Sequence, residues 1–150
     1  MPAPPRSTAE RIADTRILLH TELDCWVASA SVIGDAYLIP LSFLWDDARL
    51  LLATPRDSRT ARDLQRAGQA RIALGPPRDV VLIDATVAAH DRATIDPARA
   101  AAFAARHDWD PRAETGEYAY LLLTPTRIRA WREANELPGR TIMRDGHWLA

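Results

Sequence analysis

Three arginines recur at helical spacing directly after a short polar turn, and they are the residues of this chain best suited to hold an anion. The turn ends at Ser58, and Arg59, Arg62 and Arg66 follow it. At about 100° per residue, these three side chains fall within an arc of roughly 60° on a helix. A helix N-terminus offers unbonded N–H groups, and arginine binds phosphate with two donors at once. The spacing predicts a phosphate-binding corner, with Ser58 and Thr60 as hydroxyl donors; a solvated basic helix face is the alternative.

The other titratable residues form no recognisable catalytic or metal-binding pattern. Asp46 and Asp47 lie in a predicted hairpin turn, where aspartate is common. Cys25 is the only cysteine and lies in an apolar run, so we expect a buried structural thiol and no intrachain disulfide. The chain has no lysine, so an anion site has to use arginine, hydroxyl or backbone donors. The four histidines are far apart and lie outside any motif: His20, His90, His107 and His147.

Length and composition indicate a single globular domain. The chain has 150 residues, of which 47% are hydrophobic, and this is enough for one core. The formal net charge of −1 argues against a broad nucleic-acid-binding surface. No stretch resembles a signal peptide or a membrane span, so we expect no membrane contact and a cytoplasmic protein. Residues 1–7 are predicted to be a disordered lead-in, and residues 8–150 to form the domain.

The elements that position the arginine corner are mainly antiparallel strands. Gly34-Asp35 and Asp145-Gly146 are turn signals, and Pro40 marks a sheet edge or a bulge because proline donates no ladder hydrogen bond. The pattern predicts a split or closed antiparallel β-barrel of six to seven strands with short flanking helices. An open antiparallel sheet with helices on one face is the alternative. Strands are expected at 25–33, 36–45, 49–54, 70–74, 80–89, 117–124 and 127–132, and helices at 8–20, 58–67 and 96–107.

Several of these segments together resemble the pyridoxamine 5′-phosphate oxidase-like superfamily. These proteins are the FMN-binding split barrels, and they include flavin- and deazaflavin-dependent reductases. The resemblance implies a homodimer with two cofactor sites at the subunit interface, and chemistry carried by the cofactor without a catalytic side chain. It covers residues 24–90 and rests on Trp26-Val-Ala-Ser-Ala, Leu38-Ile-Pro-Leu-Ser-Phe-Leu-Trp, Leu50-Leu-Leu-Ala-Thr, Ser58-Arg-Thr-Ala-Arg-Asp-Leu and Arg71-Ile-Ala-Leu.

The resemblance also implies which residues hold the cofactor. Thr54 would contact the ribityl phosphate. Ser58-Arg59-Thr60 stands where the family has Ser-Arg-Lys, so Arg59 would bind the phosphate and Arg62 would compensate for the missing lysine. Asp79 stands where the true oxidases place a glutamine near the flavin. The strand that would lie along the flavin ring contributes Pro40, Leu41, Ser42 and Phe43.

The same comparison bears on the ligands. In the true oxidases this strand begins with an arginine and ends with a lysine that helps hold the substrate phosphate. This chain has Leu38 and Phe43 there, so pyridoxamine phosphate is not expected as the substrate. An apolar pocket side made of Leu41, Phe43, Trp45 and Trp131 would suit an uncharged or aromatic molecule. FMN is the expected cofactor. Coenzyme F-420 is the alternative, because its longer acidic tail would suit an arginine row that begins at Arg56.

The resulting hypothesis is an oxidoreductase that transfers a hydride, through FMN or F-420, to or from a small apolar or aromatic organic substrate. Two other hypotheses stay open. One is a non-catalytic module of the same fold that carries flavin, binds haem or senses a ligand. The other is a structural dimer without a cofactor, in which the arginine row is a solvated surface.

Overall fold

The computed structural model describes residues 3–150 and contains a closed, six-stranded antiparallel β-barrel with two further strands. The barrel order is β3-β2-β1-β4-β5-β6, and β6 returns to pair with β3. The expected fold class is therefore confirmed, and the open-sheet alternative is wrong. The strands are β1 (Asp24–Ala30), β2 (Ala36–Asp46), β3 (Arg49–Pro55), β4 (Gln69–Leu74), β5 (Val80–His90), β6 (Tyr118–Trp131), β7 (Thr141–Arg144) and β8 (His147–Trp148).

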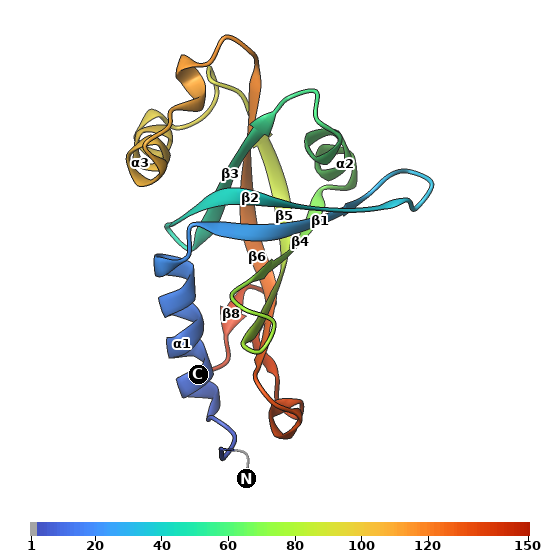
Figure 1. The fold of residues 1–150 in the computed structure, drawn as a ribbon, viewed down its shortest axis with the longest axis vertical. Coiled ribbons are helices and arrows are strands. Elements are labelled where there is room, and N and C mark those ends of the chain that lie inside the picture. The colour runs from blue at the N-terminus through green and yellow to red at the C-terminus, as the bar shows by residue number, and fades with distance from the viewer. Residues whose placement is uncertain (1–2) are drawn as a thin grey trace.

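Three α-helices lie outside the barrel (Figure 1). They are α1 (Thr8–Thr21), α2 (Arg59–Ala67) and α3 (Pro97–His107), and two short 3-10 helices follow at η1 (Pro111–Ala113) and η2 (Ala134–Glu136). Ser7 and Glu10 form the expected capping box at the start of α1. Gly68 ends α2 in the left-handed conformation, with φ of 69°, which glycine adopts without a steric penalty.

Two strands differ from their expected limits by more than one residue, and the other expected strands agree to within one. β1 ends at Ala30 rather than at residue 33, because the Ser31 amide donates to the carbonyl of Asp35 and closes the hairpin tip early. β6 runs through Pro125 as one strand, where two were expected. The β5–β6 register shifts between Asp84 and Ala85, so a bulge absorbs the residue that follows the proline.

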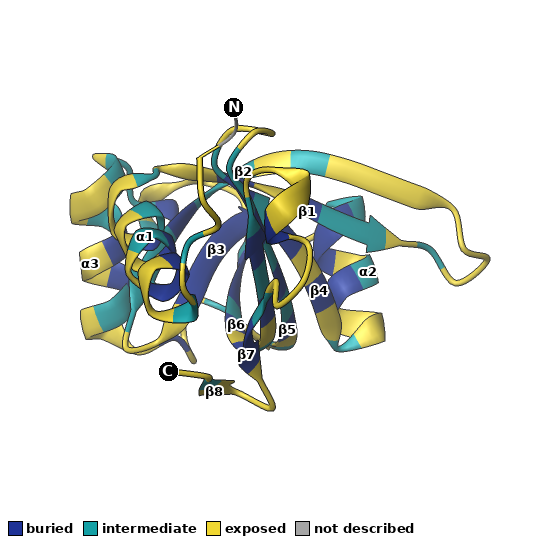
Figure 2. Cartoon of the chain, turned by 90° about the horizontal axis from the view of Figure 1, so that it is seen from below, coloured by how far each residue is buried: buried dark blue, intermediate teal, exposed yellow. Residues whose placement is uncertain are grey.

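The hydrophobic core fills the barrel, and a second cluster lies under α3. Val27, Leu52 and Ile83 are among the fully buried side chains of the interior. On the outer side of β3 and β6, Phe103 of α3 packs with Tyr120 and its neighbours. Figure 2 shows the buried residues concentrated on the barrel strands and on the inner faces of the helices. The core therefore holds β3 and β6 from both sides, whereas residues 36–42 of β2 are exposed or half-buried.

The barrel is split between β2 and β3. β2 pairs with β1 over residues 36–42, but it pairs with β3 only over residues 43–46. Beyond the Phe43–Leu52 pair, β3 continues along β6 alone. Pro40 lies in the part of β2 that has no second neighbour, so the predicted edge position is confirmed. The split leaves one edge of residues 40–42 open toward the end of β3.

The N-terminal segment is held against the opposite end of the barrel. Arg6, which falls within the expected disordered lead-in, donates from Nη2 to Glu136 Oε2 at 2.8 Å and from Nη1 to Asp14 Oδ2 at 3.0 Å. The order at Arg6 arises because Glu136 is buried and needs a cationic partner. Met1 and Pro2 lie outside the described residues. Among residues 3–150, no helix has the length and apolar character that a membrane crossing requires.

Candidate functional site

A hollow of about 360 Å³ lies where β2 and β3 separate. The open edge of β2 forms one wall, and the end of β3 forms the floor. Pro40, Leu41, Ser42 and Thr54 all line it, so the fold brings together four residues that the sequence predicted as cofactor contacts. A hollow of this size accepts part of a planar ring system.

The far wall of this hollow is aromatic, and sequence reasoning did not identify it. Trp109 and Tyr118 meet edge to face, with ring centroids 5.4 Å apart. The Trp109 indole N–H donates to Glu114 Oε1 at 2.7 Å, which fixes the ring. Both residues flank the loop after α3, and only the packing of α3 on β3 and β6 carries that loop to the split. No local sequence pattern marks them.

A polar pair lies at the edge of the same hollow. The Ser42 hydroxyl donates to Asp24 Oδ1 at 2.7 Å, because β1 and β2 pair these two residues directly. The Asp24 carboxylate can accept a further hydrogen bond from a bound molecule. The hollow therefore combines an apolar strand edge, two aromatic rings and one hydrogen-bond acceptor. This combination suits a planar organic ring that carries a donor.

The N-terminus of α2 lies beyond Thr54 and offers donors for an anion. The Thr54 and Ser58 hydroxyl oxygens are 3.3 Å apart, and Ser58 caps the helix by accepting from the Ala61 amide. The amides of Arg59 and Thr60 precede the first intrahelical donor and are free to bind a ligand. The Thr60 side chain is buried and its hydroxyl has no partner within residues 3–150, so it is turned away from any ligand at the surface.

The arginines of α2 contact different parts of the protein in the structure. Arg59 Nη2 donates to the Asp35 carbonyl at 2.7 Å, and the guanidinium lies 4.5 Å from the Tyr37 ring centroid. Arg66 donates to the Ala30 carbonyl at 2.5 Å. Both residues thus fasten α2 to the β1–β2 hairpin, while Arg62 lines a different hollow. About 31% of the Arg59 side chain remains exposed, but the guanidinium also pairs with Asp35 Oδ2 at 3.1 Å and with Asp63 Oδ2 at 3.4 Å, so a phosphate would compete with two carboxylates.

Three other predicted positions lie apart from the split. The Phe43 side chain points into the barrel core and is 1% exposed, so only its backbone is near the open edge. Asp79 lies in the β4–β5 turn, where Arg132 Nε donates to it at 3.2 Å. Trp45 packs on the core, and Trp131 lies under the Arg140 guanidinium. Of the expected apolar pocket side, Leu41 alone lines this hollow.

Neither a metal centre nor a reactive cysteine is found among the described residues. Within residues 3–150 no group of three metal-ligating side chains comes together. Cys25 is buried as expected, and its burial raises the pKa of the thiol to about 12, so it stays protonated at neutral pH. The side chains can bind, orient and shield a ligand. The residues around the split therefore fit a flavin-type cofactor, whose ring needs a strand edge and whose phosphate needs the donors near α2.

Comparison with known proteins places this geometry in a family. A family model described as pyridoxamine 5′-phosphate oxidase matches residues 14–132. No curated protein matches. A structure titled a putative pyridoxamine 5′-phosphate oxidase from Listeria innocua is 13% identical, with a TM-score of 0.66, over 81% of this chain and 98% of that one.

Two further solved structures are similar in fold. One is titled F420 reductase and is 17% identical, with a TM-score of 0.63, over 75% of this chain and 94% of that one. The other is a pyridoxamine 5′-phosphate oxidase-related, FMN-binding protein from Nostoc punctiforme. It is 18% identical, with a TM-score of 0.58, over 89% of this chain and 84% of that one. At these identities the likeness concerns the fold.

Proposed function

Because the chain belongs to the pyridoxamine 5′-phosphate oxidase family, we propose that it is a flavin-type oxidoreductase that acts on a small apolar or aromatic substrate. One observation carries the proposal. The split between β2 and β3 brings Pro40, Leu41, Ser42 and Thr54 into one hollow, beside the donor-rich start of α2. A bound FMN or F-420 would supply the hydride chemistry. The protein would bind and orient the reactants.

The residues of the split have separate tasks in this proposal. The open edge of residues 40–42 would lie along the ring and hydrogen-bond to it through backbone groups. Thr54, Ser58 and Arg59 would hold the phosphate. Trp109 would cover the ring or the substrate and exclude water. Asp24 would accept a hydrogen bond from a donor group on the substrate, which favours aromatic amines and phenols over anions.

The identity of the cofactor depends on the length of its anionic part. FMN carries a single phosphate, and the donors around Ser58 and Arg59 are sufficient for it. F-420 has a longer acidic tail, which would need further cations beyond Arg59. We retain FMN as the first choice and F-420 as the alternative.

A second copy of the chain would complete the site. The β1–β2 hairpin extends beyond the barrel and is largely exposed (Figure 2), and several of its exposed side chains are large and hydrophobic. Ile33 is 87% exposed, Leu38 is 59% exposed and Trp26 is 49% exposed, a patch that a monomer rarely leaves uncovered. We expect a dimer of two 16.7 kDa chains by analytical ultracentrifugation. Leu38→Asp should shift the mass toward one chain, because the exchange puts a charge into the covered patch.

The first experiment is the visible spectrum of the purified protein, followed by titration with FMN and, separately, with F-420. We expect tight binding of one of them. Arg59→Ala should weaken that binding by about 1.5–3 kcal/mol, the range for a charge-assisted hydrogen bond. Arg66→Ala is the matched control, because Arg66 also fastens α2 to the hairpin and lies a further two turns along the helix. Equal losses of cofactor affinity in both variants would show that Arg59 acts only by fastening the hairpin. If neither cofactor binds the native protein, the proposal is refuted.

A non-catalytic flavin carrier is the second candidate. The observation that favours it is Thr60, which stands where the family has a lysine and keeps its hydroxyl buried. Turnover separates the candidates. An oxidoreductase should reoxidise its reduced cofactor faster when an aromatic acceptor is added, whereas a carrier should show the same rate with and without the acceptor.

A further inference from the structure

A second hollow lies on the other side of α2, separate from the split. It has a volume of about 520 Å³ and is enclosed by the turn before α2, one face of α2, the end of β5 and the start of β6. Tyr118 lines both hollows, so they are neighbours across one strand. The proposed FMN site uses no residue that is confined to this second hollow, whereas the F-420 alternative would use Arg56.

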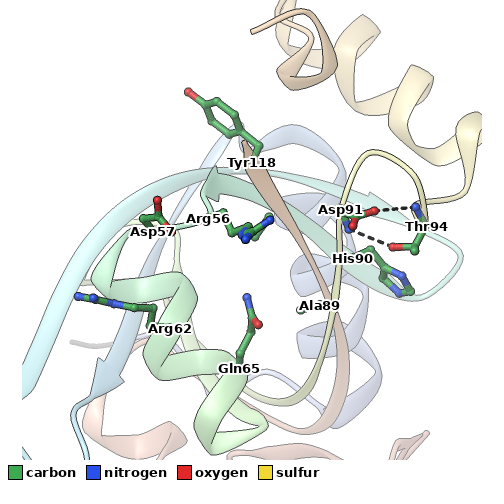
Figure 3. A pocket seen from close by; sticks show the side chains of 10 residues that line it. Arg56, Asp57, Arg62, Gln65, Ala89, His90, Asp91, Thr94 and Tyr118 are labelled. Atoms are coloured by element: carbon green, nitrogen blue, oxygen red, sulfur yellow. Dashed lines mark hydrogen bonds between the residues drawn. The ribbon is translucent and has the colours of Figure 1, made fainter. Parts of the chain in front are cut away.

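Two donors point toward one another inside it. Figure 3 shows the Arg56 guanidinium directed into the hollow, with the Gln65 side-chain amide directed toward it from α2. Neither side chain has a hydrogen-bond or ion-pair partner within residues 3–150. Within residues 3–150 Arg62 of the same hollow has no such partner either, whereas Arg71 pairs with Asp84 at 2.7 Å. Arg56 is thus an exposed cation that faces a cavity without being held in an ion pair.

The carboxylates near this hollow form no ion pair with Arg56 within residues 3–150, although the Ala93 and Thr94 amides and, less strongly, the Arg56 charge lower the pKa of the Asp91 carboxyl. The Asp91 carboxylate accepts the Ala93 and Thr94 amides at 2.8 and 2.9 Å, which close the turn after β5. Asp57 lies at the rim with its carboxylate turned outward, and Arg62 extends outward from α2 (Figure 3). The middle of the hollow therefore presents a guanidinium and an amide donor. Such a pair matches an oxyanion.

We propose that this hollow binds a small oxyanion, a phosphate or a carboxylate, on Arg56 and Gln65. Arg62 at the rim adds long-range attraction and no direct contact in this placement. The oxyanion has two sources: a separate small metabolite, or an acidic extension of a ligand whose ring lies in the neighbouring split. Binding of a separate metabolite does not depend on the proposed redox function, because neither Arg56 nor Gln65 lines the split hollow. Binding of an acidic extension rests on the F-420 alternative of that function.

The test is a titration of ¹⁵N-labelled protein with inorganic phosphate and with succinate, in about 0.15 M sodium chloride to screen weak surface attraction. We expect saturable shifts of the Arg56 Nε–H and Gln65 side-chain amide signals. Arg56→Gln should weaken binding at least about tenfold, and Arg62→Gln by less than about threefold. Arg144→Gln is the matched control, an exposed arginine remote from the hollow, and should change nothing.

Repeating the titration with FMN and with F-420 separates the two sources. Shifts of the Gln65 amide by F-420 but not by FMN would assign the oxyanion to the cofactor's acidic tail. Shifts by phosphate or succinate alone would assign it to a separate ligand. The proposal is overturned if no anion shifts these signals, if Arg56→Gln binds as tightly as Arg144→Gln, or if only the amides at the start of α2 respond.

Discussion

Replacing Glu136 by Gln should destabilise the fold by about 3 kcal/mol at pH 7. The Glu136 side chain is 4% exposed and accepts hydrogen bonds from Arg6 Nη2 at 2.8 Å, Arg6 Nε at 3.0 Å and the Arg132 amide at 3.1 Å. These donors, with Arg6 first, lower the pKa of its carboxyl from 4.5 to about 2. At about 1.4 kcal/mol per pKa unit, that difference corresponds to roughly 3 kcal/mol. Asp14 still pairs with Arg6 in the variant, so the decrease in the free energy of unfolding should lie at the low end of the range observed when a buried ion pair is broken.

The direction of the pH dependence follows from the lowered pKa. A carboxyl that is more acidic in the folded state stabilises the fold fully above its unfolded pKa of about 4.5, and this contribution is lost as the pH falls toward 2. The gap in free energy of unfolding between the native chain and Glu136→Gln should therefore be widest near neutral pH. It should narrow steadily below pH 4.5.

Urea unfolding followed by tryptophan fluorescence, at pH 7 and at pH 3, measures both effects. Glu133→Gln is the matched control. The Glu133 side chain is 54% exposed and its Oε2 lies 3.9 Å from Arg78 Nη1, so this exchange should lower the free energy of unfolding by less than about 0.5 kcal/mol. Two results would show that the Arg6–Glu136 network does not hold the N-terminal segment as described. One is a decrease in the free energy of unfolding for Glu136→Gln no larger than that for the control. The other is a difference in this free energy between native and variant chains that does not change with pH.

Two further predictions concern the core. Cys25, whose thiol pKa is raised by burial to about 12, should resist a thiol reagent at pH 8 in the folded protein and react fully in urea; rapid labelling of the folded chain would contradict its buried position. Tyr120→Phe should leave the free energy of unfolding, measured in urea, unchanged or raise it by up to about 1 kcal/mol, because the buried Tyr120 hydroxyl has no partner within residues 3–150. A loss above about 1 kcal/mol would show instead that the hydroxyl is hydrogen-bonded.

Local sequence signals were sufficient for the fold class and for most elements. These signals are the alternation of apolar residues, the Ser7–Glu10 capping box and the glycine after α2. Each acts over a few residues, so the element it specifies can be predicted without knowledge of the tertiary structure. The edge position of Pro40 was predictable for the same reason, because a residue without an N–H donor restricts strand pairing in any sheet. The strand limits that were wrong lie at the hairpin tip and at the β6 bulge, where hydrogen bonds to a partner strand decided the end.

The candidate site was only partly contained in the sequence. The family pattern pointed to residues 40–42, Thr54 and the start of α2, and the split brings these together. It could not show that Arg59 contacts the hairpin while Arg62 does not, because long side chains within one arc of roughly 60° on a helix can reach different neighbours. Trp109 and Tyr118 reach the hollow only through the packing of α3, and Arg56 faces Gln65 only because β5, β6 and α2 enclose one space. The chain's residue types determined which donors and rings were available, and long-range strand pairing and packing decided which of them meet.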